Sequence, residues 1–188
     1  GSGGVTTTVA GDVIITGGIF NLTATASANA QTLNIGGNYN QSGGTFNDGN
    51  STTAGSVKFT GSGKTFTKSA GTITGTNINW NVNSGASLTL ANDLPVSTGR
   101  TVTVNGTLNC GTNAVTGAGA FTLSSGGTLG IGSTAGITST ASSGNVQVTG
   151  TRTYSTSGNY TYNGSANQAT GDQLPSTVNN LKIGRAHV

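Results

Sequence analysis

Apolar and polar residues alternate with a period of two along nearly the whole chain. In residues 77–83, for example, Ile78, Trp80 and Val82 share one face and four asparagines occupy the other. This alternation is typical of a β-strand with one buried face. No segment carries apolar residues at the 3.6-residue period of an amphipathic helix. The pattern therefore predicts an all-β protein with essentially no helix, and it places the Trp80 ring in the core.

The face that carries the apolar residues changes twice along the chain. Apolar residues occupy even positions through residues 88–110, odd positions through residues 115–137, and even positions again through residues 146–162. Each change falls in a cluster of Gly, Asn, Ser or Thr, such as residues 111–113, where a turn can alter the face that the chain presents. We expect the apolar positions of each phase to point into one core.

Short segments recur at a spacing of roughly 20 to 24 residues, and residues 11–18 resemble residues 31–37. The aligned pairs are Val13 with Leu33, Ile15 with Ile35, Phe46 with Phe66, and Phe59 with Trp80. Val57 follows Leu33 after one further period. In a much longer repeat, Asn180 aligns with Asn79. Such a spacing, with two or three short strands per period, is the length of one coil of a parallel β-solenoid. It predicts roughly nine coils in a rod about 43 Å long. Tandem antiparallel β-sandwiches, which also combine short strands with regular turns, are the alternative fold.

Charged residues make up 6% of the 188 residues, against about 25% in an ordinary globular protein. A stacked solenoid explains this scarcity, because like charges one strand apart would repel. The formal net charge is +3, but Lys58, Lys64 and Lys68 are spread along a Gly-rich stretch instead of forming the dense basic stripe of a nucleic-acid binder. No apolar run reaches the length of a membrane span. We therefore expect neither nucleic acid nor a membrane span.

The last six residues, 183–188, resemble the translation of a common sequencing adapter, and Lys182 also fits the adapter bases. We therefore expect residues 1–181 to form a single repetitive solenoid, a fragment of a longer protein, and residues 182–188 to be a non-native tail. His187, the only histidine of the chain, is assigned no chemical role.

A solenoid needs a cap on its terminal coil, and the repeat pattern stops at Leu181. The last coil is therefore expected to expose unpaired strand backbone together with Leu174, Val178 and Leu181. Such an edge is a template for pairing with another chain. We expect self-association through this uncapped end.

Residues 105–181 resemble the Gly/Thr/Ser/Asn-rich β-strand repeats of very large secreted bacterial surface proteins, which are type IX-secreted or autotransporter-like and have adhesin-like stalks. The segments that carry the resemblance are residues 119–132 (GAFTLSSGGTLGIG), Tyr162-Asn163-Gly164, Gln168, Thr170-Gly171, Leu174-Pro175 and residues 178–181 (VNNL). The resemblance implies an extracellular or cell-surface location and a structural or adhesive role as a spacer. It implies no catalytic residues, and surface polysaccharide or a host or abiotic surface would be the partner.

Many polysaccharide lyases and hydrolases are also parallel β-helices, so a fragment of a β-helical polysaccharide-processing enzyme is the alternative function. Such enzymes need clustered carboxylates, or carboxylates that hold Ca²⁺ beside a basic residue. The acidic residues are Asp12, Asp48, Asp93 and Asp172. Only Asp12 with Asp48, and Asp48 with Asp93, are spaced to meet on adjacent coils, and neighbouring glycines explain two of them as turn residues. We therefore expect no enzyme activity.

The single cysteine and a group of tyrosines are two further candidates for binding residues. Cys110 continues the apolar phase and is expected to be a small buried hydrophobe, and a lone cysteine excludes an internal disulfide. Tyr154, Tyr160 and Tyr162 could stack on sugars if exposed, but they share the phase of the apolar residue Val146, which favours the core. The chain carries no copy of the Gly-Gly-x-Gly-x-Asp calcium repeat and no Gly-rich loop that opens a helix, so no metal or cofactor is expected.

Three Thr-x-Thr pairs form a third candidate, a Thr ladder that binds ice or another ordered surface. The pairs lie at residues 72–74, 101–103 and 151–153. Their spacings are unequal and do not correspond to one constant coil length. Outward positions occupied by good β-formers are therefore the alternative explanation.

Overall fold

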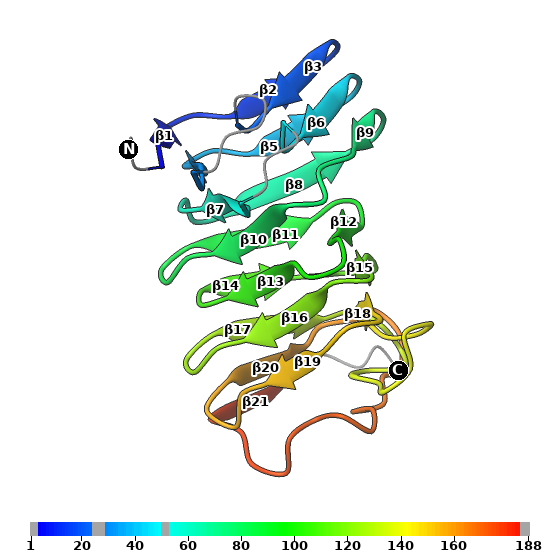
Figure 1. Cartoon of the computed structure of the whole chain (residues 1–188). Helices are drawn as coiled ribbons and strands as arrows, with labels where there is room; N and C mark the ends of the chain where they lie inside the picture. The colour runs from blue at the N-terminus through cyan, green and yellow to red at the C-terminus, as the bar shows by residue number, and fades with distance from the viewer. Residues whose placement is uncertain (1–3, 24–28, 50–52, 185–188) are drawn as a thin grey trace.

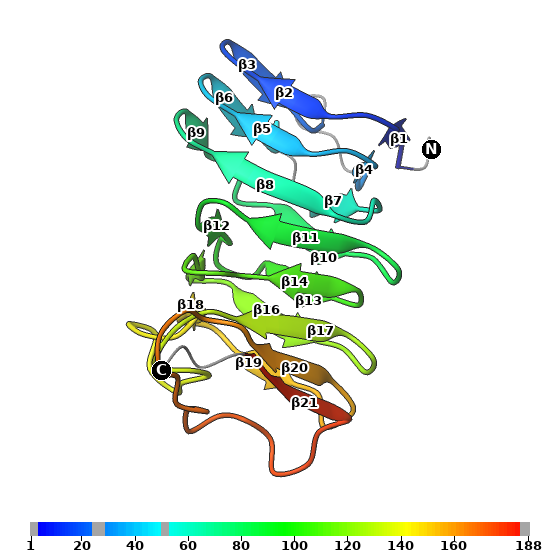
Figure 2. The ribbon, with the colours of Figure 1, turned by 180° about the vertical axis from the view of Figure 1, so that it is seen from behind.

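Short strands wind around one axis and stack on one another, so that the chain forms a rod of coils (Figures 1 and 2). The computed structural model describes residues 4–23, 29–49 and 53–184, and these residues form 21 strands and no helix. Every strand pair among them is parallel. The predicted all-β parallel solenoid is thereby confirmed, and the antiparallel sandwiches are excluded.

Two long sheets form two sides of the rod. Sheet A contains, in spatial order, β1 (Thr6–Val9), β4 (Thr32–Ile35), β7 (Gly55–Phe59), β10 (Ile78–Val82), β13 (Thr101–Val104), β16 (Ala120–Leu123) and β19 (Arg152–Tyr154). Sheet B contains β2 (Val13–Ile15), β5 (Tyr39–Gln41), β8 (Lys64–Lys68), β11 (Ser87–Leu90), β14 (Thr107–Asn109), β17 (Thr128–Ile131), β20 (Asn159–Tyr162) and β21 (Asn180–Ile183).

The third side consists of two shorter sheets. Sheet C contains β3 (Ile19–Asn21), β6 (Thr45–Asn47) and β9 (Thr72–Ile73), and sheet D contains β12 (Leu94–Pro95), β15 (Val115–Gly117) and β18 (Val146–Val148). Sheets A, B and the third side enclose one hydrophobic cluster that extends from Ile15 to Tyr162. The core therefore runs along the axis of the rod.

The seven strands of sheet A correspond to about seven coils, not the nine that the repeat spacing predicts. At about 4.8 Å per step, the rod is about 30 Å long from β1 to β19. The coil count is lower because most coils are longer than the shortest repeat spacing in the sequence. A long coil leads from Thr6 to its partner Thr32, whereas a short one leads from Thr101 to Ala120.

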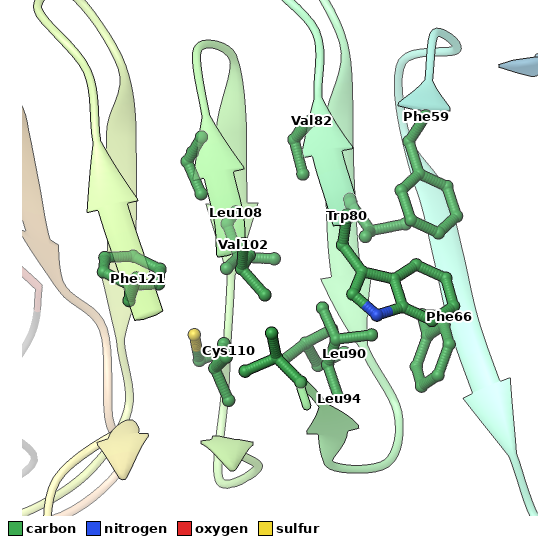
Figure 3. Packing of buried hydrophobic residues seen from close by; sticks show 14 of the residues in the cluster. Phe59, Phe66, Trp80, Val82, Leu90, Leu94, Val102, Leu108, Cys110 and Phe121 are labelled. Carbon is green, nitrogen blue, oxygen red and sulfur yellow. The ribbon is translucent and has the colours of Figure 1, made fainter. Parts of the chain in front are cut away.

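The buried side chains differ along the rod. The first coils are long, as the pairing of Thr6 with Thr32 shows, and they surround large buried aromatic rings. These rings belong to Tyr39, Phe46, Phe59, Phe66 and Trp80. The shorter coils that follow enclose aliphatic side chains and Cys110, as Figure 3 shows beside Val102 and Leu108.

One coil carries an insertion. The coil from Phe121 to its partner Arg152 is much longer than its neighbours, because residues 132–145 form an extra segment between β17 and β18, whose Ile137 side chain belongs to the hydrophobic cluster. The coil then resumes in register, since Val146 on β18 pairs with Val115 on β15. The insertion thus lengthens one coil without interrupting sheet B or sheet D.

The variable coil length makes several of the predicted alignments wrong. Val13 pairs with Tyr39 and not with Leu33, Ile35 pairs with Val9, Phe46 lies between Phe20 and Ile73, Trp80 pairs with Val57, and Asn79 and Asn180 lie in different sheets. The alignment of Leu33 with Val57 is confirmed. The inward phases are also correct: Trp80, Cys110 and Tyr160 are all buried.

The C-terminal end is more covered than the sequence predicts. Leu181 is 45% exposed, as expected, but Leu174 and Val178 are partly buried against the core. They belong to the long loop between β20 and β21, which lies beyond β19 in Figures 1 and 2. Lys182, assigned to the tail, pairs with Thr161, whereas His187 lies outside the described residues.

Candidate functional site

A pair of neighbouring carboxylates would support the enzyme alternative, and the four aspartates are the residues that could form one. Asp12 lies at the corner between β1 and β2, where one carboxylate oxygen accepts hydrogen bonds from the backbone N–H of Asn38 at 2.6 Å and its side-chain amide at 3.1 Å. These bonds lower the pKa of the exposed Asp12 carboxyl. The Asn38 side chain in turn accepts the backbone N–H of Thr65 at 2.9 Å. Each coil is thus fastened to the next at this corner.

Asp48 and Asp93 do the same at two other corners. Asp48 follows β6, is 3% exposed, and accepts the backbone N–H of Asn77 at 2.8 Å. The hydroxyl of Thr23 donates to the Asp48 carbonyl. Asp93 precedes β12 and accepts the backbone N–H of Ala114 at 2.8 Å. The two predicted pairs are Asp12 with Asp48 and Asp48 with Asp93. The structure divides each pair between two different corners of the coil.

Asp172 fastens the C-terminal loop to the insertion. Its carboxylate accepts the hydroxyl of Ser139 at 2.5 Å and the backbone N–H of the same residue at 2.7 Å, and both bonds lower the Asp172 pKa. All four carboxylates thus accept hydrogen bonds from another coil or from the insertion. Their role in this geometry is to satisfy backbone donors at turns.

The insertion is held by polar side chains that the sequence did not single out. Arg152 donates from Nη1 to the Thr138 carbonyl at 2.7 Å and from Nε to the Val148 carbonyl at 3.0 Å. Asn145, 3% exposed, accepts the backbone N–H of Gly132 at 3.0 Å and donates to the Gly111 carbonyl at 2.9 Å. The buried Asn145 amide uses both its oxygen and its NH₂ group in hydrogen bonds, and it thereby fixes both ends of the insertion.

Cys110 is fully buried beside Leu108 and Val102 (Figure 3). Burial raises the pKa of its thiol to about 12. Because the thiolate is the nucleophile and the metal ligand, this side chain has the properties of a packing residue. This agrees with the expected small buried hydrophobe.

Tyr154, Tyr160 and Tyr162 lie in the last coils of the rod. Tyr160 and Tyr162 are buried, and their hydroxyls donate to the carbonyls of Ser155 at 2.8 Å and Thr170 at 2.6 Å. Burial raises both pKa values to about 12. Tyr154 is half-buried, and its ring lies 5.9 Å from that of Phe121, centroid to centroid. These rings form no exposed platform for a sugar.

The outer face of sheet A gathers small polar side chains in two columns, which we call the sheet A columns. The first column contains Thr6, Thr32, Ser56, Asn79, Thr101 and Ala120, and the second contains Thr8, Asn34, Lys58, Asn81, Thr103, Thr122 and Thr153. Neighbours in a column are about 4.8 Å apart. Two of the predicted Thr pairs, at residues 101–103 and 151–153, thus share one face.

The third pair, at residues 72–74, lies on the third side of the rod. Thr72 is on β9 in sheet C, where its hydroxyl is 2.9 Å from that of Thr45. The lysines are also divided, since Lys58 is on sheet A while Lys64 and Lys68 are on sheet B. The structure does not collect them into a basic stripe.

Within residues 4–23, 29–49 and 53–184, no group of three or more His, Cys, Asp or Glu side chains could hold a metal ion. In the same part of the chain, no helix is long and apolar enough to cross a membrane. In comparisons with known proteins, no family model, no curated protein and no solved structure matches this chain.

Proposed function

We propose that the chain is a structural spacer, a stalk segment of a large secreted surface protein. The observation that carries this proposal is the continuity of the rod: two sheets and one hydrophobic cluster run through about seven coils. In such a stack each coil contacts only its neighbours, so length can be added coil by coil without changing the fold. A cell-surface spacer needs this property, because it holds other domains away from the surface.

The use of the polar residues supports the same role. Asp12, Asp48 and Asp93 lie at three different corners, and each accepts a backbone N–H from a later coil. Cys110 is buried. Among the described residues, these reactive side chains thus accept backbone hydrogen bonds or fill the core. This favours a structural role over polysaccharide processing.

Single-molecule pulling between the two ends tests the spacer. A stack of coils with nearest-neighbour contacts is expected to unravel in several steps, each releasing one or a few coils. One coil of about 20 residues would add about 70 Å of extended chain. One featureless extension at negligible force would contradict a spacer that resists tension. A depolymerising activity on polysaccharide would instead favour the enzyme alternative.

Adsorption to an ordered surface such as ice is the second candidate, favoured by the sheet A columns. Their hydroxyl and amide groups repeat at the strand spacing from Thr6 to Thr101 in the first column and, apart from Lys58, from Thr8 to Thr153 in the second. Lys58 and Ala120 interrupt them, so only the part around Thr103 and Thr122 is uniform.

A pair of matched variants tests this candidate. Replacement of Thr103 and Thr122 by Lys places charges on the sheet A columns. Replacement of Thr107 and Thr128, which pair in the same way on sheet B, is the control. Ice binding that only the sheet A variant abolishes would support adsorption through this face. No ice binding by the parent chain, or equal loss in both variants, would reject it.

A further inference from the structure

An Asn-Gly pair forms a whole corner in the middle of the rod (Figure 1). Asn105 and Gly106 alone connect β13 of sheet A to β14 of sheet B, whereas four residues connect β10 to β11 and four connect β16 to β17. Asn105 is exposed. The corner is therefore short, and it presents an asparagine to solvent directly before a glycine.

The stacking of the coils requires glycine at the second of these positions. A Cβ atom on Gly106 would collide with the carbonyl oxygens of Asn83 and Ala86 in the preceding coil. Glycine is the residue that allows such a close approach of two backbones. The fold itself thus maintains the Asn-Gly sequence at this corner.

An asparagine that precedes glycine can lose its side-chain amide without an enzyme. The backbone nitrogen of Gly106 gives its proton to a solvent base and attacks Cγ of Asn105. The bond from Cγ to the side-chain nitrogen then breaks, ammonia leaves, and a succinimide ring remains. Water opens the ring at either carbonyl and yields aspartate or isoaspartate. Because glycine has no Cβ atom, no side chain obstructs the attack.

The hydrogen bonds at this corner hold the two reacting groups only weakly. Within residues 4–23, 29–49 and 53–184, the Asn105 side chain makes no hydrogen bond. The N–H of Gly106 donates to the Val82 carbonyl at 3.1 Å, and the N–H of Asn105 donates to the same oxygen at 2.9 Å. The attacking nitrogen is thus held by one long hydrogen bond, and the amide that it attacks is free to turn.

A second Asn-Gly pair, directly after β20, has the same exposure but different hydrogen bonds. The side-chain amide of Asn163 donates to Oδ1 of Asn109 at 3.0 Å. The N–H of Gly164 donates to Oε1 of Gln168 at 2.8 Å. Asn163 is also exposed, so solvent access does not distinguish the two pairs. What distinguishes them is that both reacting groups of the second pair are held.

We propose that Asn105 is a site of spontaneous deamidation, and that it reacts faster than Asn163 in the folded chain. Isoaspartate lengthens the main chain by one carbon atom, and a corner of two residues has no slack to absorb it. The N–H of Thr107, which donates to the Ala86 carbonyl at 2.9 Å at the start of β14, is then displaced. Because each coil is stabilised by its neighbours, the reaction weakens the rod at its middle.

Peptide mapping of the full chain by mass spectrometry, after incubation at mildly alkaline pH, is the test. Deamidation at Asn105 should be about fivefold faster or more than at Asn163, because one more hydrogen bond must break at Asn163. In guanidinium chloride, which removes the hydrogen bonds of both pairs, the two rates should become similar. Methylation by an isoaspartate methyltransferase identifies the isoaspartate product.

Gln168→Ala tests the protective role of the hydrogen bonds. It frees the N–H of Gly164 and should raise the rate at Asn163, while the rate at Asn105 stays the same. If this variant fails to fold by circular dichroism, Asn109→Ala replaces it. That change frees the side-chain amide of Asn163 and should accelerate the same reaction.

Asn105→Ser is the matched control for the effect on the rod. Serine occupies the equivalent position of the next coil, where the N–H of Ser124 donates to the Val104 carbonyl as that of Asn105 does to Val82. Incubation at alkaline pH should lower the urea concentration at the midpoint of unfolding for the parent chain, and clearly less for Asn105→Ser.

Equal rates at Asn105 and Asn163 in the folded chain, or a faster rate at Asn163, would overturn the proposal. So would a folded chain that keeps Asn105 intact while the unfolded chain deamidates there. An unchanged rate at Asn163 in a folded Gln168→Ala or Asn109→Ala variant would show that the hydrogen bonds do not protect, and would reject the structural explanation.

Discussion

The rings of Phe59 and Trp80 stack with their centroids 6.3 Å apart and their planes at 12°, although the backbone ladder pairs Trp80 with Val57. Trp80 also makes edge contacts with the rings of Tyr39, Phe46 and Phe66. One indole therefore contacts aromatic side chains from three sides of the rod. Its loss should destabilise several neighbouring coils.

We predict that Trp80→Ala lowers the free energy of unfolding by about 3 to 5 kcal/mol, the usual cost of removing a large core aromatic ring. Urea unfolding followed by circular dichroism measures this change. Trp80→Phe, which keeps a ring in the cluster, should cost clearly less. A cost below about 1 kcal/mol for Trp80→Ala would mean that the indole does not fill the core.

The alternation predicts which residues point inward, but it does not predict how far apart the coils are in sequence. Side-chain direction in a strand depends only on the period of two, so Trp80 and Cys110 are placed correctly. Register depends on coil length, which varies from the short coil that follows Thr101 to the long one that follows Phe121. Turn residues can be added or removed at a corner without changing which strand residues point inward. The alternation therefore does not reveal the length of a coil.

Variable coil length also explains why the sequence does not show which Thr pairs share a face. Thr103 and Thr153 share one column, but the sequence between them spans one short coil and the coil with the insertion. The corner role of Asp12 and Asp48 is visible in sequence as a neighbouring glycine. The pairing of Arg152 with the insertion carries no such signal, because its acceptors are backbone carbonyls.

A buried amide provides a second prediction. Gln41, 1% exposed, accepts the hydroxyl of Tyr39 at 2.8 Å and donates to the Thr72 carbonyl at 2.9 Å. Gln41→Leu leaves the buried Tyr39 hydroxyl without its acceptor and should cost about 1 to 3 kcal/mol. Adding Tyr39→Phe should cost less in this background than in the parent chain. Strictly additive effects in urea unfolding would show that the two side chains are not coupled.

The third prediction concerns acid. Hydrogen bonds from Asn38 and Ser139 lower the pKa values of Asp12 and Asp172 in the folded chain from 3.8. Above the unfolded pKa the stabilisation is complete, and as the pH falls through the folded pKa it is lost, because the unfolded state binds protons first. The urea concentration at the midpoint of unfolding should therefore decrease as the pH is lowered below about 5.

The double variant Asp12→Asn with Asp172→Asn is the control for this pH dependence. It removes both titrating groups, so its midpoint should change less with pH than that of the parent. Identical pH profiles for the two proteins would show that these carboxyls do not contribute.

A fourth prediction separates structural from catalytic carboxylates. Replacement of all four aspartates by Asn should preserve the β-sheet circular dichroism spectrum, because Asn retains an oxygen that accepts the backbone N–H. The largest local change is expected at Asp172, where both carboxylate oxygens accept from Ser139. Loss of a polysaccharide-depolymerising activity in a folded variant would contradict the structural role.

The most direct test of the parallel rod is the distance between two spin labels in one sheet A column. Thr8 and Thr153 are the outer members of the second column, six coil steps apart. After Cys110→Ala, cysteines at these two positions can be labelled and their separation measured by pulsed electron paramagnetic resonance. The rod predicts a narrow distribution near about 30 Å, as six steps of strand spacing require. A broad distribution, or one centred far from this value, would contradict the single stack of coils on which the spacer proposal depends.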